Sequence, residues 1–226
     1  MRILAINPGS TTTKIAVYED EKKVFVERIN HPEEELSHFV RVTDQYDYRK
    51  KHILTCLSNH AVPFEFDAII GRGGLGKPTR GGVYEVNAQL RLDMLNAQRK
   101  HACNLGCLIA YELAHMLPDC RALTADPVTV DEMEDVARLT GSTLMPRRSI
   151  WHALNQRAIA FRFAKEQGKK YEDFNLIVAH LGGGISVAAH QKGRAVDVNN
   201  ALDGEGPFSP ERAGTLPTSD LITLCY

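Results

Sequence analysis

Two parts of the chain repeat one pattern of hydrophobic and polar positions: an apolar run, a loop of small residues, then two apolar or β-branched stretches. In the first part this pattern predicts strands at residues 3–6, 11–18 and 24–29. In the second part it predicts strands at residues 175–180, 185–189 and 195–198. Strands joined by such short turns form antiparallel meanders. We therefore predict an internal duplication of supersecondary structure, with one β-meander in each of two lobes.

Between and after the meanders, apolar residues recur at helical spacing. This spacing predicts helices at about 47–58, 88–117 (broken near residues 100–104), 130–139 and 150–167. Gly141 and Gly168 follow the last two of these, where glycine commonly ends a helix. Shorter apolar runs predict two more strands, at 66–70 and 122–125. Mixed strands and helices indicate the α/β class, and we divide the chain into lobes at 1–148 and 149–226.

The last residues, 218–226, begin a helical pattern with N-cap residues and an apolar stripe. The pattern stops after about two helical turns. We therefore expect the second lobe to be incomplete and the chain to be a fragment of a longer protein.

Composition narrows the class of protein. Hydrophobic residues make up 43% and charged residues 24%, which is typical of a soluble globular protein. The charge balance is 27 Lys+Arg against 28 Asp+Glu with no block of one sign, so we expect neither a nucleic-acid nor a membrane partner. No apolar run approaches the ~20 residues that cross a bilayer. The five cysteines include no Cys-x-x-Cys pair, which predicts reduced thiols and a cytoplasmic protein.

Two loops carry the candidate chemistry. Residues 7–14 read Asn-Pro-Gly-Ser-Thr-Thr-Thr-Lys, and residues 180–184 read His-Leu-Gly-Gly-Gly. Small residues let backbone N–H groups approach an anion, while hydroxyl groups and a lysine add donors. Two such loops in duplicated lobes would hold a polyphosphate from both sides of a cleft. The alternative is a pair of ordinary hairpin turns.

A third glycine-rich segment, at 71–82, matches Gly-x-Gly-x-x-Gly and nearly matches a P-loop. Pro78 stands where a P-loop needs Ser or Thr, and no helix is predicted to open after the segment. We therefore reject both motifs. What remains is Arg72 at the end of a buried strand, either as an anion-binding residue or as a surface arginine.

For four further candidates, the sequence pattern alone does not decide between a functional and a structural role. His101 lies near Cys103 and Cys107, but this spacing fits no common zinc site, so a packing role competes with a functional one. Asp126 ends a short strand, as a ligand or as a turn residue. His152 and Arg212, taken alone, are structural as readily as functional.

The candidate chemistry includes no nucleophile or metalloprotease signature. Phosphoryl transfer to a carboxylate needs no general base, because the carboxylate that attacks is already an anion near neutral pH. Positive charge and positioning are then sufficient.

Together these motifs resemble the acetate/butyrate kinase family, which has the sugar kinase–heat shock protein–actin fold. Residues 7–14 and 180–184 are similar to its first and second phosphate motifs. Residues 101–106, 152–156 and 199–214 are similar to its butyrate kinase branch. The resemblance covers the whole chain, and implies a two-lobed actin-like fold whose second lobe is incomplete.

The resemblance also implies a reaction, ATP + butyrate ⇌ ADP + butyryl phosphate, with Mg²⁺. It implies that Arg72 and Arg212 hold the carboxylate and the phosphoryl group. His152 would donate to the phosphoryl oxygens, with His101 helping to position them, and Asp126 would bind Mg²⁺. The implied phosphate-binding residues are Asn7, Ser10, Thr12, Lys14, His180, Gly182, Gly183 and Gly184.

Family members continue well past residue 226, and the resemblance implies a homodimer at full length. The further part holds the adenosine-binding segment, so we expect weak activity at best from this chain alone. Two alternatives stay open. One is a phosphate-binding fragment without catalysis, and the other is a sugar kinase or ATPase of the same fold, with an Asp as base.

Overall fold

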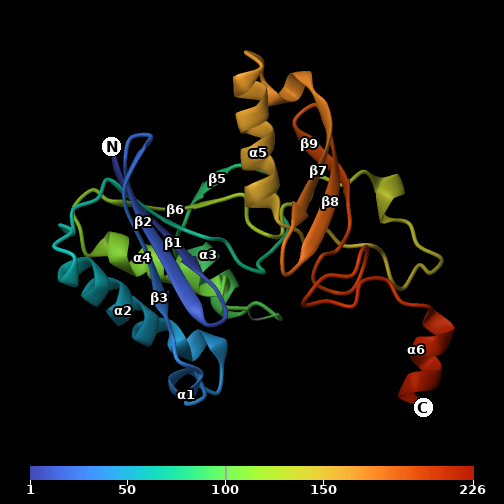
Figure 1. The fold of residues 1–226 in the computed structure, drawn as a ribbon, viewed down its shortest axis with the longest axis horizontal. Coiled ribbons are helices and arrows are strands. Elements are labelled where there is room, and N and C mark those ends of the chain that lie inside the picture. Colours follow the sequence, from blue (N-terminus) through green and yellow to red (C-terminus); the bar gives the residue numbers. More distant parts are fainter. Residues whose placement is uncertain (100) are drawn as a thin grey trace. The chain divides into compact units, whose positions relative to one another are not determined.

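The computed structural model describes residues 1–99 and 101–226, and the predicted α/β class is confirmed (Figure 1). The chain forms two compact units. Unit 1 comprises residues 1–77 and 82–127, and unit 2 comprises residues 78–81 and 128–226. The lobe boundary at residue 148 stays a prediction.

Unit 1 is built on a six-stranded mixed sheet with the order β3-β2-β1-β4-β6-β5. Its strands are β1 (Arg2–Pro8), β2 (Thr12–Glu19), β3 (Lys22–Asn30), β4 (Ala68–Gly71), β5 (Val83–Glu85) and β6 (Arg121–Ala125). The first three form the predicted antiparallel meander, while β1, β4 and β6 run parallel to one another. The carboxyl ends of β1, β4 and β6 therefore lie at one edge of the sheet, where α/β proteins commonly bind ligands.

The helices of unit 1 are α1 (Glu33–Leu36), α2 (Tyr46–Asn59), α3 (Ala88–Leu95) and α4 (Asn104–His115), with a 3-10 turn, η1 (Val42–Gln45). Helix α4 is apolar on most sides and buries Leu105, Ile109 and Leu113 completely as it packs on β4 and β6. The predicted long helix is divided where the sequence indicated, although residue 100 lies outside the described residues. The short α1 and η1 were not predicted.

Glycines let α4 approach β4 closely. A Cβ atom added to Gly71 would lie 2.0 Å from the carbonyl oxygen of Gly106, and one added to Gly106 would lie 2.3 Å from that of Arg72. Both distances are far below van der Waals contact. These glycines thus serve helix–strand packing, and no helix opens in the 71–82 segment, in agreement with the rejection of the phosphate-loop motifs.

Unit 2 contains the second predicted meander, a three-stranded antiparallel sheet of β7 (Asn175–Leu181), β8 (Ile185–Gln191) and β9 (Arg194–Val198). Its other elements are α5 (Ala153–Glu166), α6 (Thr218–Cys225) and the 3-10 turns η2 (Asp135–Arg138) and η3 (Tyr171–Asp173). Helix α5 ends where Gly168 adopts a φ of 66°, as predicted for a C-terminal glycine.

The helix predicted at 130–139 is wrong, because only the short turn η2 forms there. Val130 instead pairs with Thr79 in a parallel bridge, and the Asp131 N–H donates to the Thr79 carbonyl oxygen at 2.8 Å. The Asp131 carboxylate accepts two hydrogen bonds from Arg138, at 2.9 and 2.8 Å. These tertiary partners favour an extended backbone over the helix that apolar spacing alone indicated.

Among the described residues, no helix combines the length and the apolar character that crossing a membrane requires.

Candidate functional site

Three predicted site residues lie at the carboxyl ends of the parallel strands of unit 1. Asn7 comes at the end of β1, Arg72 directly after β4, and Asp126 directly after β6. Register pairs Ile6 with Gly71 and Ile70 with Leu123, so the three residues lie at the same edge of the sheet. The Arg72 Nη1 group donates to Asn7 Oδ1 at 3.3 Å.

The β1–β2 hairpin adds further candidates to this edge. Lys14 is the cross-strand partner of Asn7, and both side chains are exposed. Thr12 lies two residues before Lys14 and therefore on the same face of β2, while Thr13 points to the opposite face and is buried. Ser10 is exposed in the loop between the two strands. The structure thus brings Asn7, Lys14 and Arg72 together, with Ser10 and Thr12 in the adjoining loop.

Arg49 on α2 bonds the β1–β2 loop from the buried side, a role that was not predicted from the sequence. Its side chain is completely buried, and its guanidinium group donates to the carbonyl oxygens of Gly9 at 2.8 Å, Ser10 at 2.7 Å and Thr12 at 3.1 Å. Burial lowers the pKa of Arg49 to about 10, so the group remains charged at neutral pH. The guanidinium group therefore hydrogen-bonds carbonyl oxygens that would otherwise repel an anion bound at the loop.

Thr13 and His31 complete the support of the loop. The Thr13 hydroxyl accepts from Arg49 Nη1 at 3.1 Å and lies 2.8 Å from His31 Nε2. Burial, followed by the charge of Arg49, lowers the pKa of His31 to about 4. His31 is therefore neutral at pH 7, and its Nε2 shares a buried hydrogen bond with the Thr13 hydroxyl.

Asp126 and His101 are each fixed by backbone N–H groups. Asp126 Oδ1 accepts from the Gly82 N–H at 2.7 Å, and Asp126 has a φ of 37°. His101 Nδ1 accepts from the Cys103 N–H at 3.2 Å, just before α4 begins. Mg²⁺ is commonly bound by one or two carboxylates together with substrate phosphates and water, so Asp126 fits that donor chemistry. In the described parts of the chain, His, Cys, Asp and Glu form no group of three or more that could hold a metal.

The candidates of unit 2 converge on the β7–β8 turn. His152, the residue before α5, stacks on His180 of β7 with ring centroids 3.8 Å apart and an interplanar angle of 7°. Asn155 Nδ2 donates to His180 Nδ1 at 2.9 Å. The two imidazoles are thus held in parallel, one from the helix and one from the sheet.

The glycines of this turn permit close approach of charged side chains. A Cβ atom on Gly183 would lie 2.4 Å from Glu211 Oε1, and one on Gly184 would lie 2.2 Å from Arg212 Nη1 and 3.2 Å from His152 Cε1. The Glu211 N–H donates to the Gly183 carbonyl oxygen at 3.2 Å, which ties the Arg212 loop to the turn. His152, His180, the glycine turn and Arg212 therefore form one cluster within unit 2.

Some members of these clusters were not predicted. Asn155 and Gln156 follow His152 by one helical turn, and this spacing was the available signal for them. Ser186, which contacts His152, is the cross-strand partner of His180. Arg49 has no comparable signal, because nothing in its neighbourhood distinguishes a buried arginine from an exposed one.

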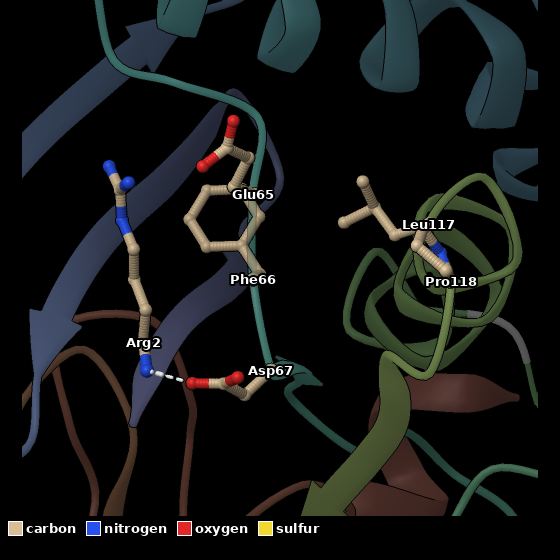
Figure 2. A pocket seen from close by; sticks show the side chains of 6 residues that line it. All are labelled: Arg2, Glu65, Phe66, Asp67, Leu117 and Pro118. Atoms are coloured by element: carbon tan, nitrogen blue, oxygen red, sulfur yellow. Dashed lines mark hydrogen bonds between the residues drawn. The ribbon is translucent and has the colours of Figure 1, made fainter.

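A separate pocket of about 350 Å³ lies at the opposite edge of the unit 1 sheet, where β1 and β4 begin. Figure 2 shows its lining: Arg2, Glu65, Phe66, Asp67, Leu117 and Pro118. The Arg2 guanidinium group lies 5.4 Å from the centre of the Phe66 ring, and the Arg2 N–H donates to Asp67. This pocket contains none of the predicted site residues.

Comparisons with known proteins agree with the motifs. The Acetokinase family matches residues 140–208. The whole chain is 64% identical to "Probable butyrate kinase" of Bacteroides thetaiotaomicron and 56% identical to the protein of the same name from Phocaeicola vulgatus. The chain spans 64% of the length of each of these relatives.

Solved structures show the same fold. Acetate kinase from Porphyromonas gingivalis superposes with a TM-score of 0.70 at 19% identity, over 99% of this chain and 63% of that one. A propionate kinase from Francisella tularensis gives 0.69 at 16% identity, over 99% of this chain and 63% of that one. The fold and the resemblance to the acetate/butyrate kinase family, both predicted from the sequence, are therefore confirmed.

Proposed function

We propose that the protein is a butyrate kinase, which reversibly transfers the terminal phosphoryl group of ATP to butyrate or a similar short-chain carboxylate. The products are butyryl phosphate and ADP. The proposal is carried by the 64% identity, along the whole chain, to a protein named "Probable butyrate kinase". The clusters in units 1 and 2 support it, because they supply the cationic and N–H donors that phosphoryl transfer to a carboxylate needs.

In unit 1, the proposed phosphate-binding groups are Asn7, Ser10, Thr12 and Lys14. Their amide, hydroxyl and ammonium groups are donors to phosphate oxygens. Arg49 supports this role by holding the loop carbonyl oxygens on the side away from the exposed residues. Asp126 would hold Mg²⁺, and the bound ion would neutralise part of the negative charge of the phosphates.

The transfer step requires charge stabilisation rather than proton removal. A carboxylate attacks as an anion, and negative charge spreads over the oxygens of the transferred group. Arg72 and Arg212 are assigned to the carboxylate and the phosphoryl group, because a guanidinium fork matches both geometrically. His152 donates to the phosphoryl oxygens and His101 assists in positioning them. His180 and the N–H groups of Gly182, Gly183 and Gly184 complete the phosphate contacts.

The proposal includes the cellular location, the binding partners and the oligomeric state. All reactants are small anions, and the cysteine pattern and charge balance favour a cytoplasmic protein without nucleic-acid or membrane partners. The family resemblance adds a homodimer at full length.

A choice of acceptor tests the proposal. A chimera is prepared in which these 226 residues replace the matching part of the Bacteroides relative. ADP release from Mg-ATP is then measured with butyrate, acetate or glucose as acceptor. Butyrate-dependent release supports the proposal. Release with glucose alone favours a sugar kinase, and phosphate binding without release favours a non-catalytic module.

A further inference from the structure

A buried chain of hydrogen bonds extends behind His152 in unit 2. His152 Nδ1 lies 2.9 Å from Ser186 Oγ, Gln156 Nε2 lies 2.8 Å from the same oxygen, and His190 Nε2 lies 3.0 Å from Gln156 Oε1. At the far end of this series of hydrogen bonds, the Tyr171 hydroxyl bonds His190 Nδ1. The four residues behind His152 are at most 2% exposed, so solvent does not supply alternative partners.

The orientation of the Gln156 amide sets the direction of the whole chain. Gln156 Nε2 donates to the backbone carbonyl oxygen of Ser186 at 2.9 Å. A carbonyl oxygen only accepts, so the amide nitrogen must face Ser186 and the amide oxygen must face His190. His190 Nε2 therefore carries a hydrogen, and its Nδ1 accepts from the Tyr171 hydroxyl. Burial, followed by the charge of Arg157, lowers the pKa of His190 to about 4, which agrees with this neutral ring.

Ser186 then has only one way to bond His152. Its Oγ accepts from Gln156 Nε2 and from the His152 backbone N–H at 3.3 Å, which occupies both lone pairs of the hydroxyl. The single hydroxyl hydrogen remains for His152 Nδ1. The Nδ1 atom is therefore an acceptor, and the imidazole hydrogen is on Nε2.

We propose that Ser186, oriented by Gln156, is a positioning residue that fixes His152 as a neutral Nε2–H donor. The assignment of that donor to the transferred phosphoryl group rests on the proposed function. The stacked His180 has the same arrangement, since Asn155 donates to its Nδ1. Two parallel rings 3.8 Å apart are not charged at the same time without a penalty, because like charges at that distance repel, and the acceptor role of each Nδ1 leaves both rings neutral.

Long-range ¹H–¹⁵N spectra of the 226-residue chain with labelled histidine test the inference directly, because they distinguish protonated from unprotonated ring nitrogens. His152→Gln assigns the signals. We expect the Nε2–H tautomer in the unmodified chain. In Ser186→Ala, we expect the ratio of Nε2–H to Nδ1–H to fall roughly fivefold, which corresponds to ~1 kcal/mol for one hydrogen bond. Ser149→Ala is the matched control, since Ser149 is also buried in unit 2 but bonds the Val130 carbonyl oxygen.

An Nδ1–H or doubly protonated His152 in the unmodified chain overturns the inference, whether or not the variant folds. An unchanged ratio in a folded Ser186→Ala also overturns it. The spectra do not depend on turnover. The expected tautomer in the 226-residue chain, together with a folded chimera that releases no ADP with butyrate, would therefore contradict the proposed function and leave the tautomer assignment standing.

Discussion

The buried guanidinium group of Arg49 donates to the backbone carbonyl oxygen of Ser10 at 2.7 Å, across 39 positions of sequence. The same group also bonds Gly9, Thr12, Thr13 and Gln45. One charged side chain in the interior of unit 1 thus holds the conformation of the first candidate phosphate loop.

Removal of the Arg49 side chain should be costly. Arg49→Ala removes the donor from the buried oxygens of Gln45 and Thr13 and from three loop carbonyl oxygens, and each polar group left unsatisfied in the interior typically costs ~1–3 kcal/mol. Urea-induced unfolding measures the loss. Arg41→Ala is the matched control, because Arg41 is an exposed arginine paired with Asp44 and should change stability by about 0.5 kcal/mol or less. Equal effects of the two substitutions would show that Arg49 does not hold the loop.

Gly106→Ala should destabilise unit 1 although alanine favours helices. The new Cβ atom would lie 2.3 Å from the Arg72 carbonyl oxygen, and relieving such overpacking typically costs ~1–3 kcal/mol, or more against rigid backbone. Thermal melting measures the change. Gly141→Ala is the control, because nothing lies within 4 Å of its added Cβ atom. A Gly106→Ala protein as stable as that control would rule out the close contact between α4 and the end of β4.

Stability should fall as the pH is lowered from 7 to 5. His31 and His190 both have folded-state pKa values lowered from 6.5 to about 4, so the unfolded chain binds more protons in this range. The stabilisation is fully present above about pH 6.5 and is lost toward pH 4, approaching about 3 kcal/mol per histidine. Urea unfolding at pH 7, 6 and 5 tests the slope. The double variant with His31→Gln and His190→Gln should show a weaker slope, and an unchanged one would contradict this origin.

The features of the fold and of the candidate site that depend on local sequence patterns could be predicted from the sequence. Both meanders and the break between α3 and α4 follow from alternation, small-residue loops and apolar spacing. Asn7 was singled out as part of a small-residue loop, and Arg72 and Asp126 because each ends a predicted strand; parallel pairing then places the three at one edge.

What the sequence could not predict depends on long-range contacts. Val130 has helical spacing in its neighbourhood, but its bridge to Thr79 keeps the segment extended. Arg49 bonds the loop from a helix far along the chain, and no local signal marks it. Ser186 lies in an ordinary strand pattern, and its role follows only from the hydroxyl's three partners.

The most direct test of the central claim is acyl phosphate formation, trapped as the hydroxamate. The reaction contains Mg-ATP, butyrate and either the 226-residue chain or the chimera with the Bacteroides relative. We predict butyryl hydroxamate from the chimera, weak formation at best from the chain alone, and a loss of at least ~100-fold in Arg212→Ala of the chimera, as for removal of one transition-state donor. A folded chimera that forms no hydroxamate, or an Arg212→Ala variant as active as its parent, would contradict the account.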